Sequence, residues 1–114
     1  GDGHALQGDA ELCGSGLETT MEVTFQFELI KGKKIAWPRI ENDEYIMTVG
    51  SVRPLSDALR IAAVEMVEWL EADYKFEKWD AYQALSQLTR ILVANMVDPN
   101  YSVVVKFPKR YLPH

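Results

Sequence analysis

The spacing of the hydrophobic residues changes near Pro54, and this change restricts the fold more than any other feature of the 114-residue chain. Before Pro54, hydrophobic residues alternate with polar ones, which is typical of strands with one buried face. After it, they recur every three or four residues, which is typical of helices. The sequence therefore predicts an α+β fold, in which helices cover one face of an antiparallel sheet.

The segment before Pro54 is expected to form a small antiparallel meander over residues 21–50. Its third strand has Tyr45, Met47 and Val49 on one face. A turn with a charged tip at residues 31–34 leads to the second strand, at residues 35–37, which Pro38 restricts to a sheet edge or a strand end. The first strand follows Met21, where four hydrophobic residues alternate with polar ones: Val23, Phe25, Phe27 and Leu29.

Two helices and a last strand are expected after Pro54. The first helix covers residues 55–73, and Glu65, Glu68 and Glu71 are expected on its solvated face. The second begins at about Lys78, after Glu77, which is a poor residue type for a helix cap. Its hydrophobic stripe is Ala81, Leu85, Leu88 and Leu92, and the last strand alternates at Val103, Val105 and Phe107.

Charge and cysteine content exclude several classes of protein. Twelve Lys and Arg against seventeen Asp and Glu give a net charge of -5 with no basic stripe, so we expect no nucleic-acid partner. No hydrophobic run reaches the roughly 18 residues of a membrane span, and no export leader is visible. The single Cys13 forms no internal disulfide, which fits a reducing compartment and predicts a cytoplasmic protein.

Residues 1–20 hold five of the seven glycines and a group of metal-ligating and acid–base residue types. On extended backbone, residues two apart project from the same face, and the short link between the two pairs would bring them side by side. One imidazole and three carboxylates at such short range need a cation; zinc suits this mixed set, whereas calcium prefers all-oxygen ligands. The group consists of Asp2, His4, Gln7, Asp9 and Glu11.

Spacing alone leaves other interpretations open. A solvated loop accounts for the same residues, and the glycines match neither the dinucleotide-binding nor the P-loop pattern. Cys13 is a candidate nucleophile with His4 as its base, although a lone cysteine is more often a small buried hydrophobic residue. Trp37, Trp79 and Tyr82 are candidate pocket residues, whereas Trp69 lies on a helix stripe and is expected in the core.

The segment from Gly1 to Glu18 resembles the signature of the acetamidase/formamidase family, which runs G-D-x-H-A-x-Q-G-D-G-E and continues through small residues to a glutamate. Ala10 stands where that pattern has a glycine. Later motifs are similar to the C-terminal half of the family in the same order, so the resemblance covers nearly the whole chain. These motifs are Trp37-Pro38-Arg39, Asp80-Ala81-Tyr82, Val97-Asp98-Pro99 and Phe107-Pro108-Lys109.

The resemblance implies metal-dependent hydrolysis of short linear amides, such as formamide or acetamide, to a carboxylate and ammonia. By the resemblance, Asp2 and His4 are metal ligands, Glu11 is the general base or a further ligand, and Asp9 is its catalytic neighbour. The implied metal is zinc, with calcium as the alternative. The residues that orient water or substrate are Gln7 and Glu18.

Members of this family are several times longer than this chain. The resemblance therefore implies the C-terminal portion of an enzyme, in which residues 1–20 complete a β-rich domain that is absent here and residues 21–114 form the α+β domain. A surface made for the missing portion, or for a second chain, is expected to be exposed and to favour homo-oligomers. The alternative is a non-catalytic assembly or binding domain with a flexible N-terminal arm.

Overall fold

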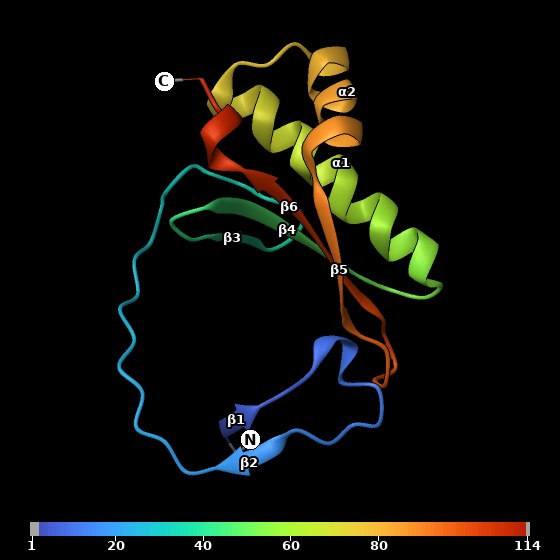
Figure 1. The fold of residues 1–114 in the computed structure, drawn as a ribbon. Helices are drawn as coiled ribbons and strands as arrows, with labels where there is room; N and C mark the ends of the chain where they lie inside the picture. Colours follow the sequence, from blue (N-terminus) through green and yellow to red (C-terminus); the bar gives the residue numbers. More distant parts are fainter. Residues whose placement is uncertain (1–2, 114) are drawn as a thin grey trace.

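The computed structural model describes residues 3–113 and shows an α+β unit with a small separate ribbon (Figure 1). In the α+β unit, four antiparallel strands are ordered β3-β4-β6-β5, and both helices contact the same sheet. Neither of these helices has the length and hydrophobicity needed to cross a membrane. The elements are β3 (Arg39–Glu41), β4 (Tyr45–Ser51), α1 (Leu55–Tyr74), α2 (Lys78–Leu88), β5 (Arg90–Asn95) and β6 (Ser102–Pro108).

The ribbon lies at the opposite end of the molecule from the helices (Figure 1). It pairs β1 (Gly3–Leu6) with β2 (Leu17–Thr19) in antiparallel fashion, and a one-turn 3-10 helix, η1 (Asp9–Glu11), lies between them. A second 3-10 turn, η2 (Lys109–Tyr111), follows β6. Residues 20–38, which we call the strap, cross from the ribbon to β3.

The core lies between α1 and the two central strands, β4 and β6. The face of β4 that is fully buried consists of Ile46, Thr48 and Gly50, while the opposite face that contains Tyr45 is half-buried. Thr48 Oγ1 donates a hydrogen bond to the carbonyl oxygen of Ala62 at 2.6 Å, so its hydroxyl is satisfied inside the core. The helix expected over residues 55–73 is confirmed as Leu55–Tyr74.

Glycine is required at position 50 because the helix approaches β4 very closely. A Cβ atom added to Gly50 would stand 2.0 Å from the carbonyl oxygen of Ala58. Any side chain there would push α1 away from the sheet.

The strand expected after Met21 is wrong for this chain. The strap has no strand over residues 20–30, and its hydrophobic side chains are exposed, with Phe25 at 71% and Phe27 at 89%. A strand needs a neighbour for its backbone hydrogen bonds, and the described part of the chain places none beside the strap. The short strand expected at residues 35–37 also lies too early, because the edge strand is β3, after Pro38.

The end of the second helix and its cap differ from expectation. α2 ends at Leu88, and Leu92 belongs to β5, where the β-branched Ile91 and Val93 favour a strand. Glu77 is a working cap, since its side-chain carboxylate accepts hydrogen bonds from the backbone amides of two residues in the first turn of α2. The last strand is confirmed as β6.

Candidate functional site

His4 and Glu18 face each other across the ribbon. They are register partners of β1 and β2, so their side chains project from the same face. The His4 ring lies over Gly16, where an added Cβ would be 2.7 Å from the ring Nδ1 atom. Glycine at position 16 therefore makes room for the imidazole, and both His4 and Glu18 stay exposed.

Gln7 fixes the orientation of the His4 ring. The His4 Nδ1 atom lies 2.8 Å from Gln7 Oε1, and an amide oxygen only accepts hydrogen bonds, so this contact suits the tautomer that is protonated at Nδ1. In that neutral tautomer, the other ring nitrogen, Nε2, presents a free lone pair. This is the arrangement in which a neutral histidine ligates a metal or accepts a proton.

Asp9 and Glu11 lie on a tight turn and not on an extended segment, so the expected side-by-side pairing of two extended segments is wrong. The backbone of η1 has positive φ at Ala10 (67°) and at Glu11 (46°). Ala10 is 6% exposed, and its carbonyl oxygen accepts a hydrogen bond of 2.9 Å from the Met96 amide. This packing against the end of β5 turns η1 away from a strand conformation.

Glu11 is directed toward the α+β unit. Its Oε2 atom accepts a hydrogen bond from Asn95 Nδ2 at 3.4 Å, and Asn95 also donates to the Asp98 carboxylate at 2.7 Å. Sequence reasoning did not single out Asn95, because a lone asparagine near a strand end carries no motif. Glu11 is half-buried, whereas Asp9 is exposed.

The described residues alone do not make a complete metal site. Across residues 3–113, no group of three or more His, Cys, Asp and Glu side chains is arranged to hold a metal ion. The contact with Gln7 suits the ligand tautomer of His4, and Glu18 stands opposite it, which gives two donors where zinc takes three or four. Asp2, the other expected ligand, lies outside the described residues.

The other sequence candidates have different outcomes. Cys13 is exposed, so the expectation of a small buried hydrophobic residue is wrong. Trp69 is 7% exposed and belongs to the core, as expected. Trp79 and Tyr82 pack edge to face with their ring centroids 6.4 Å apart, and they line an open groove of about 300 Å³ between α1 and α2.

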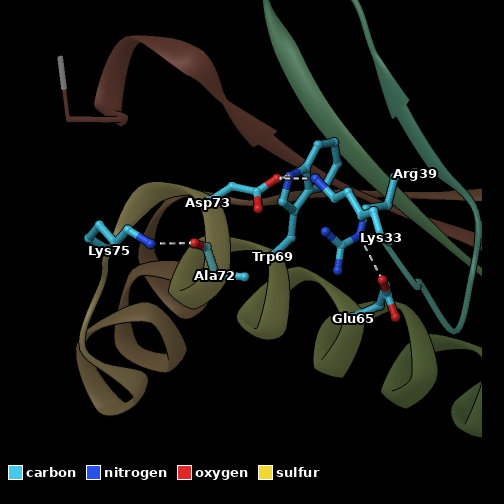
Figure 2. Close-up of polar contacts among 7 residues, drawn as sticks. All are labelled: Lys33, Arg39, Glu65, Trp69, Ala72, Asp73 and Lys75. Atoms are coloured by element: carbon cyan, nitrogen blue, oxygen red, sulfur yellow. Dashed lines mark hydrogen bonds and ion pairs between the residues drawn. The ribbon is translucent and has the colours of Figure 1, made fainter. Parts of the chain in front are cut away.

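A buried ion pair joins β3 to α1, and sequence reasoning missed it (Figure 2). Arg39 Nε donates to Glu65 Oε1 at 2.7 Å, and the side chains are only 13% and 2% exposed. The Arg39 guanidinium also lies 5.0 Å from the centre of the Trp69 ring. Glu65 was expected on the solvated face with Glu68, but it lies three residues after Ala62 and four before Trp69, which places it on the buried stripe.

The strap is attached beside this pair. Lys33 Nζ donates to Asp73 Oδ2 at 2.7 Å, and Trp69 Nε1 donates to the same oxygen at 3.0 Å (Figure 2). The hydrogen bond from Lys33 lowers the pKa of Asp73, while burial raises the pKa of the neighbouring Tyr74. These residues border an open cavity of about 430 Å³ whose charged groups are already paired, so the network serves to hold the strap against α1.

Comparison with known proteins decides the family. The profile of the Acetamidase/Formamidase family matches residues 1–112. The chain belongs to this family. Among solved structures, the acetamidase from Yersinia enterocolitica is 48% identical with a TM-score of 0.94, over 97% of this chain and 34% of that one.

Two further structures share the fold of the acetamidase/formamidase family at lower identity. The acetamidase from Bacillus halodurans is 21% identical with a TM-score of 0.76, over 95% of this chain and 37% of that one. A predicted acetamidase/formamidase from Thermoanaerobacter tengcongensis is 23% identical with a TM-score of 0.78, over 94% and 36%. No curated protein matches. The chain thus spans about a third of the solved acetamidase chains.

Proposed function

We propose that this chain is the part of an amide hydrolase that supplies acid–base and ligand residues to an active site completed by the rest of the enzyme. The whole enzyme would hydrolyse short linear amides of the formamide or acetamide type to a carboxylate and ammonia. The observation that carries this proposal is the 48% identity to the Yersinia acetamidase over 97% of the chain. His4 held by Gln7 opposite Glu18 supports it.

Five residues of this region have a role in the proposal: His4, Gln7, Asp9, Glu11 and Glu18. Amide hydrolysis requires a group that takes a proton from the attacking water, and Glu11, held by Asn95, is our candidate base with Asp9 beside it in η1. Gln7 keeps the Nε2 lone pair of His4 free. Glu18, across from His4, would orient water or the amide nitrogen.

The proposed cofactor is a divalent metal, with zinc preferred because His4 is among its ligands and calcium as the alternative. A bound zinc ion would supply Lewis-acid chemistry at the amide carbonyl. His4 Nε2 and Asp2 would hold it from this chain. The remaining ligands would come from the part of the enzyme outside these residues, since the described residues lack a complete set.

The test uses a full-length enzyme in which this chain replaces the matching third of the Yersinia acetamidase. We expect His4→Ala to lose bound metal and amide turnover together. Glu11→Gln is expected to keep the metal and to lower turnover by about 100-fold or more, the range of a lost general base. Gln7→Leu is expected to weaken metal binding by about 10- to 100-fold, as second-shell changes do.

Glu22→Gln is the matched control, because Glu22 is an exposed strap residue outside the ribbon. It is expected to leave metal content and turnover unchanged. Unchanged metal content and unchanged turnover in both His4→Ala and Glu11→Gln would reject the amidase assignment. That result would favour the alternative, a non-catalytic assembly domain whose first twenty residues form an arm.

A further inference from the structure

The strap keeps the side-chain pattern of a strand although no partner strand lies beside it within residues 3–113. The rings of Phe25 and Phe27 lie on one side, with their centroids 6.0 Å apart. On the other side, Gln26 Nε2 donates a hydrogen bond to the Glu28 carboxylate. Residues two apart thus share a side, as they do in extended backbone.

The hydrophobic side of the strap is exposed along its whole length from residue 21 to residue 29. Phe27 is 89% exposed and Leu29 is 82% exposed, while residues of β4, α1 and β6 bury a core of their own. Contiguous exposed hydrophobic residues of this kind mark a binding surface. Within residues 21–30, the exposed hydrophobic residues are Met21, Val23, Phe25, Phe27, Leu29 and Ile30.

The comparison with the Yersinia acetamidase indicates what covers this surface. The fold agrees over 97% of this chain with a TM-score of 0.94, so the strap follows nearly the same course in that crystal structure. There it is part of a chain about three times as long, since the match covers 34% of it. That chain therefore holds a strap of nearly the same shape together with about two-thirds of additional sequence that could pack against it.

We propose that residues 21–30 form a β-strand in a sheet completed by the part of the acetamidase chain outside these 114 residues. The side of Phe25 and Phe27 would be buried against that part, and the side of Gln26 would face away from it. Backbone hydrogen bonds would supply affinity and the alternating side chains would supply register. This inference rests on the family membership that also underlies the proposed function, but it does not depend on a metal or on amide turnover.

The experiment compares hydrogen exchange of the amides of residues 22–30 in the isolated chain and in the full-length chimera with the Yersinia enzyme. We expect fast exchange in the isolated chain and about 100-fold or greater slowing in the chimera, because strand amides exchange only by opening. Equal exchange rates in the two proteins would overturn the proposal. A chimera that fails to fold while the parent enzyme folds would also overturn it, because the strap would then not fit the sheet.

Two neighbouring substitutions of equal charge separate the two sides of the strap. In the chimera, Phe27→Glu buries a charge and is expected to raise the amide exchange rates of residues 22–30 by at least about tenfold. Gln26→Glu is expected to leave these rates unchanged. Both are expected to leave the melting temperature of the isolated chain unchanged, since both side chains are exposed there. Equal effects of the two variants in the chimera would contradict the assigned sides.

The competing occupant is a second copy of this chain. Sedimentation velocity of the isolated chain over a range of concentrations tests it. If the chain dimerises and Phe27→Glu abolishes the dimer while the chimera stays unprotected at residues 22–30, the strap pairs with another copy and the proposal is wrong. A chimera without amide turnover whose residues 22–30 are still protected from exchange would reject only the proposed function.

Discussion

Arg39 reaches from the edge strand β3 to Glu65 on α1, and their ion pair is sealed by the Trp69 ring on one side (Figure 2). Removing one partner would leave the other charge buried and unpaired, which costs about 3 to 5 kcal/mol. We expect Arg39→Met to lower the free energy of unfolding by about 3 kcal/mol, measured by urea denaturation, because Glu65 has no other partner in the described structure.

The double variant Arg39→Met/Glu65→Leu is expected to recover most of that loss, since a well-packed hydrophobic pair often replaces a buried ion pair at little cost. Lys33→Met is the control at the exposed ion pair with Asp73, and we expect a loss of less than about 1 kcal/mol there. Additive losses in the double variant would show that the two charges do not act as a pair.

Gly50→Ala tests the close approach of α1 to β4. A methyl group at this position would stand 2.0 Å from the Ala58 carbonyl oxygen, so the helix must shift. We expect a loss of about 3 kcal/mol or more in the free energy of unfolding, at the upper end of overpacking costs. Gly8→Ala is the control, because an added Cβ meets nothing within 4 Å there. Equal melting temperatures of the two variants would show that α1 does not approach β4 this closely.

Ala10 occupies the left-handed region with φ of 67°, at the position where the family signature has glycine. In Ala10→Gly, relief of about 1–2 kcal/mol of backbone strain is offset by about 0.8 kcal/mol for the lost methyl burial and about 0.5–1 kcal/mol of chain entropy. We therefore expect a change in unfolding free energy within about 1 kcal/mol.

Ala10→Val combines a β-branched side chain with a positive φ and is expected to cost more than the glycine variant and to loosen η1 from β5. Faster exchange of the Met96 amide, which donates to the Ala10 carbonyl, would report that loosening. Equal Met96 exchange rates in both variants would mean that η1 tolerates the strain.

The pH dependence of stability reports on Asp73. Its pKa is held below the ordinary value of 3.8 mainly by the hydrogen bond from Lys33, so the folded state favours the carboxylate. The resulting stabilisation is present above the ordinary pKa and is lost as the pH falls through the lowered one. We expect Asp73→Asn to be less stable than the parent chain at pH 7 and the gap to close on acidification below about pH 4. If the difference in unfolding free energy between Asp73→Asn and the parent chain does not change with pH, the loss of stability comes from packing and not from the charge of Asp73. Glu68→Gln is the control, because Glu68 is exposed on α1.

The α+β unit was predictable because the spacing of its hydrophobic residues reflects faces that are buried within the unit itself. The periodicity of α1 matches the face that it buries, and the predicted bounds of α1 and β6 lie within a few residues of the observed ones. The strap shows the limit of the same reasoning: its alternation is a true strand pattern, but a strand also needs a partner, and none lies within residues 3–113. The prediction of a solvated Glu65 is wrong because a glutamate on the stripe between Ala62 and Trp69 is buried despite its charge.

The sequence shows which metal-ligating and acid–base residue types the ribbon contains, but it does not show how the backbone arranges them. The residue types of His4 and Gln7 are visible in the sequence, and their hydrogen bond follows from a separation of three residues across the end of a short strand. The positive φ at Ala10 and Glu11 does not follow from their own residue types, which disfavour it; the glycine of the family signature is a signal for it at position 10. Only the contact with β5, far along the chain, accounts for that turn.

Through the contact between η1 and β5, the α+β unit also fixes the conformation of the ribbon. The Met96 amide and the Asn95 side chain hold the backbone and the carboxylate of a turn that precedes them by more than eighty positions in the chain. The hairpin of β5 and β6 therefore holds Glu11 in position. A packing error among the helices, which contact β6, would be transmitted along that hairpin and would shift the Glu11 carboxylate, although no residue of the ribbon itself had changed.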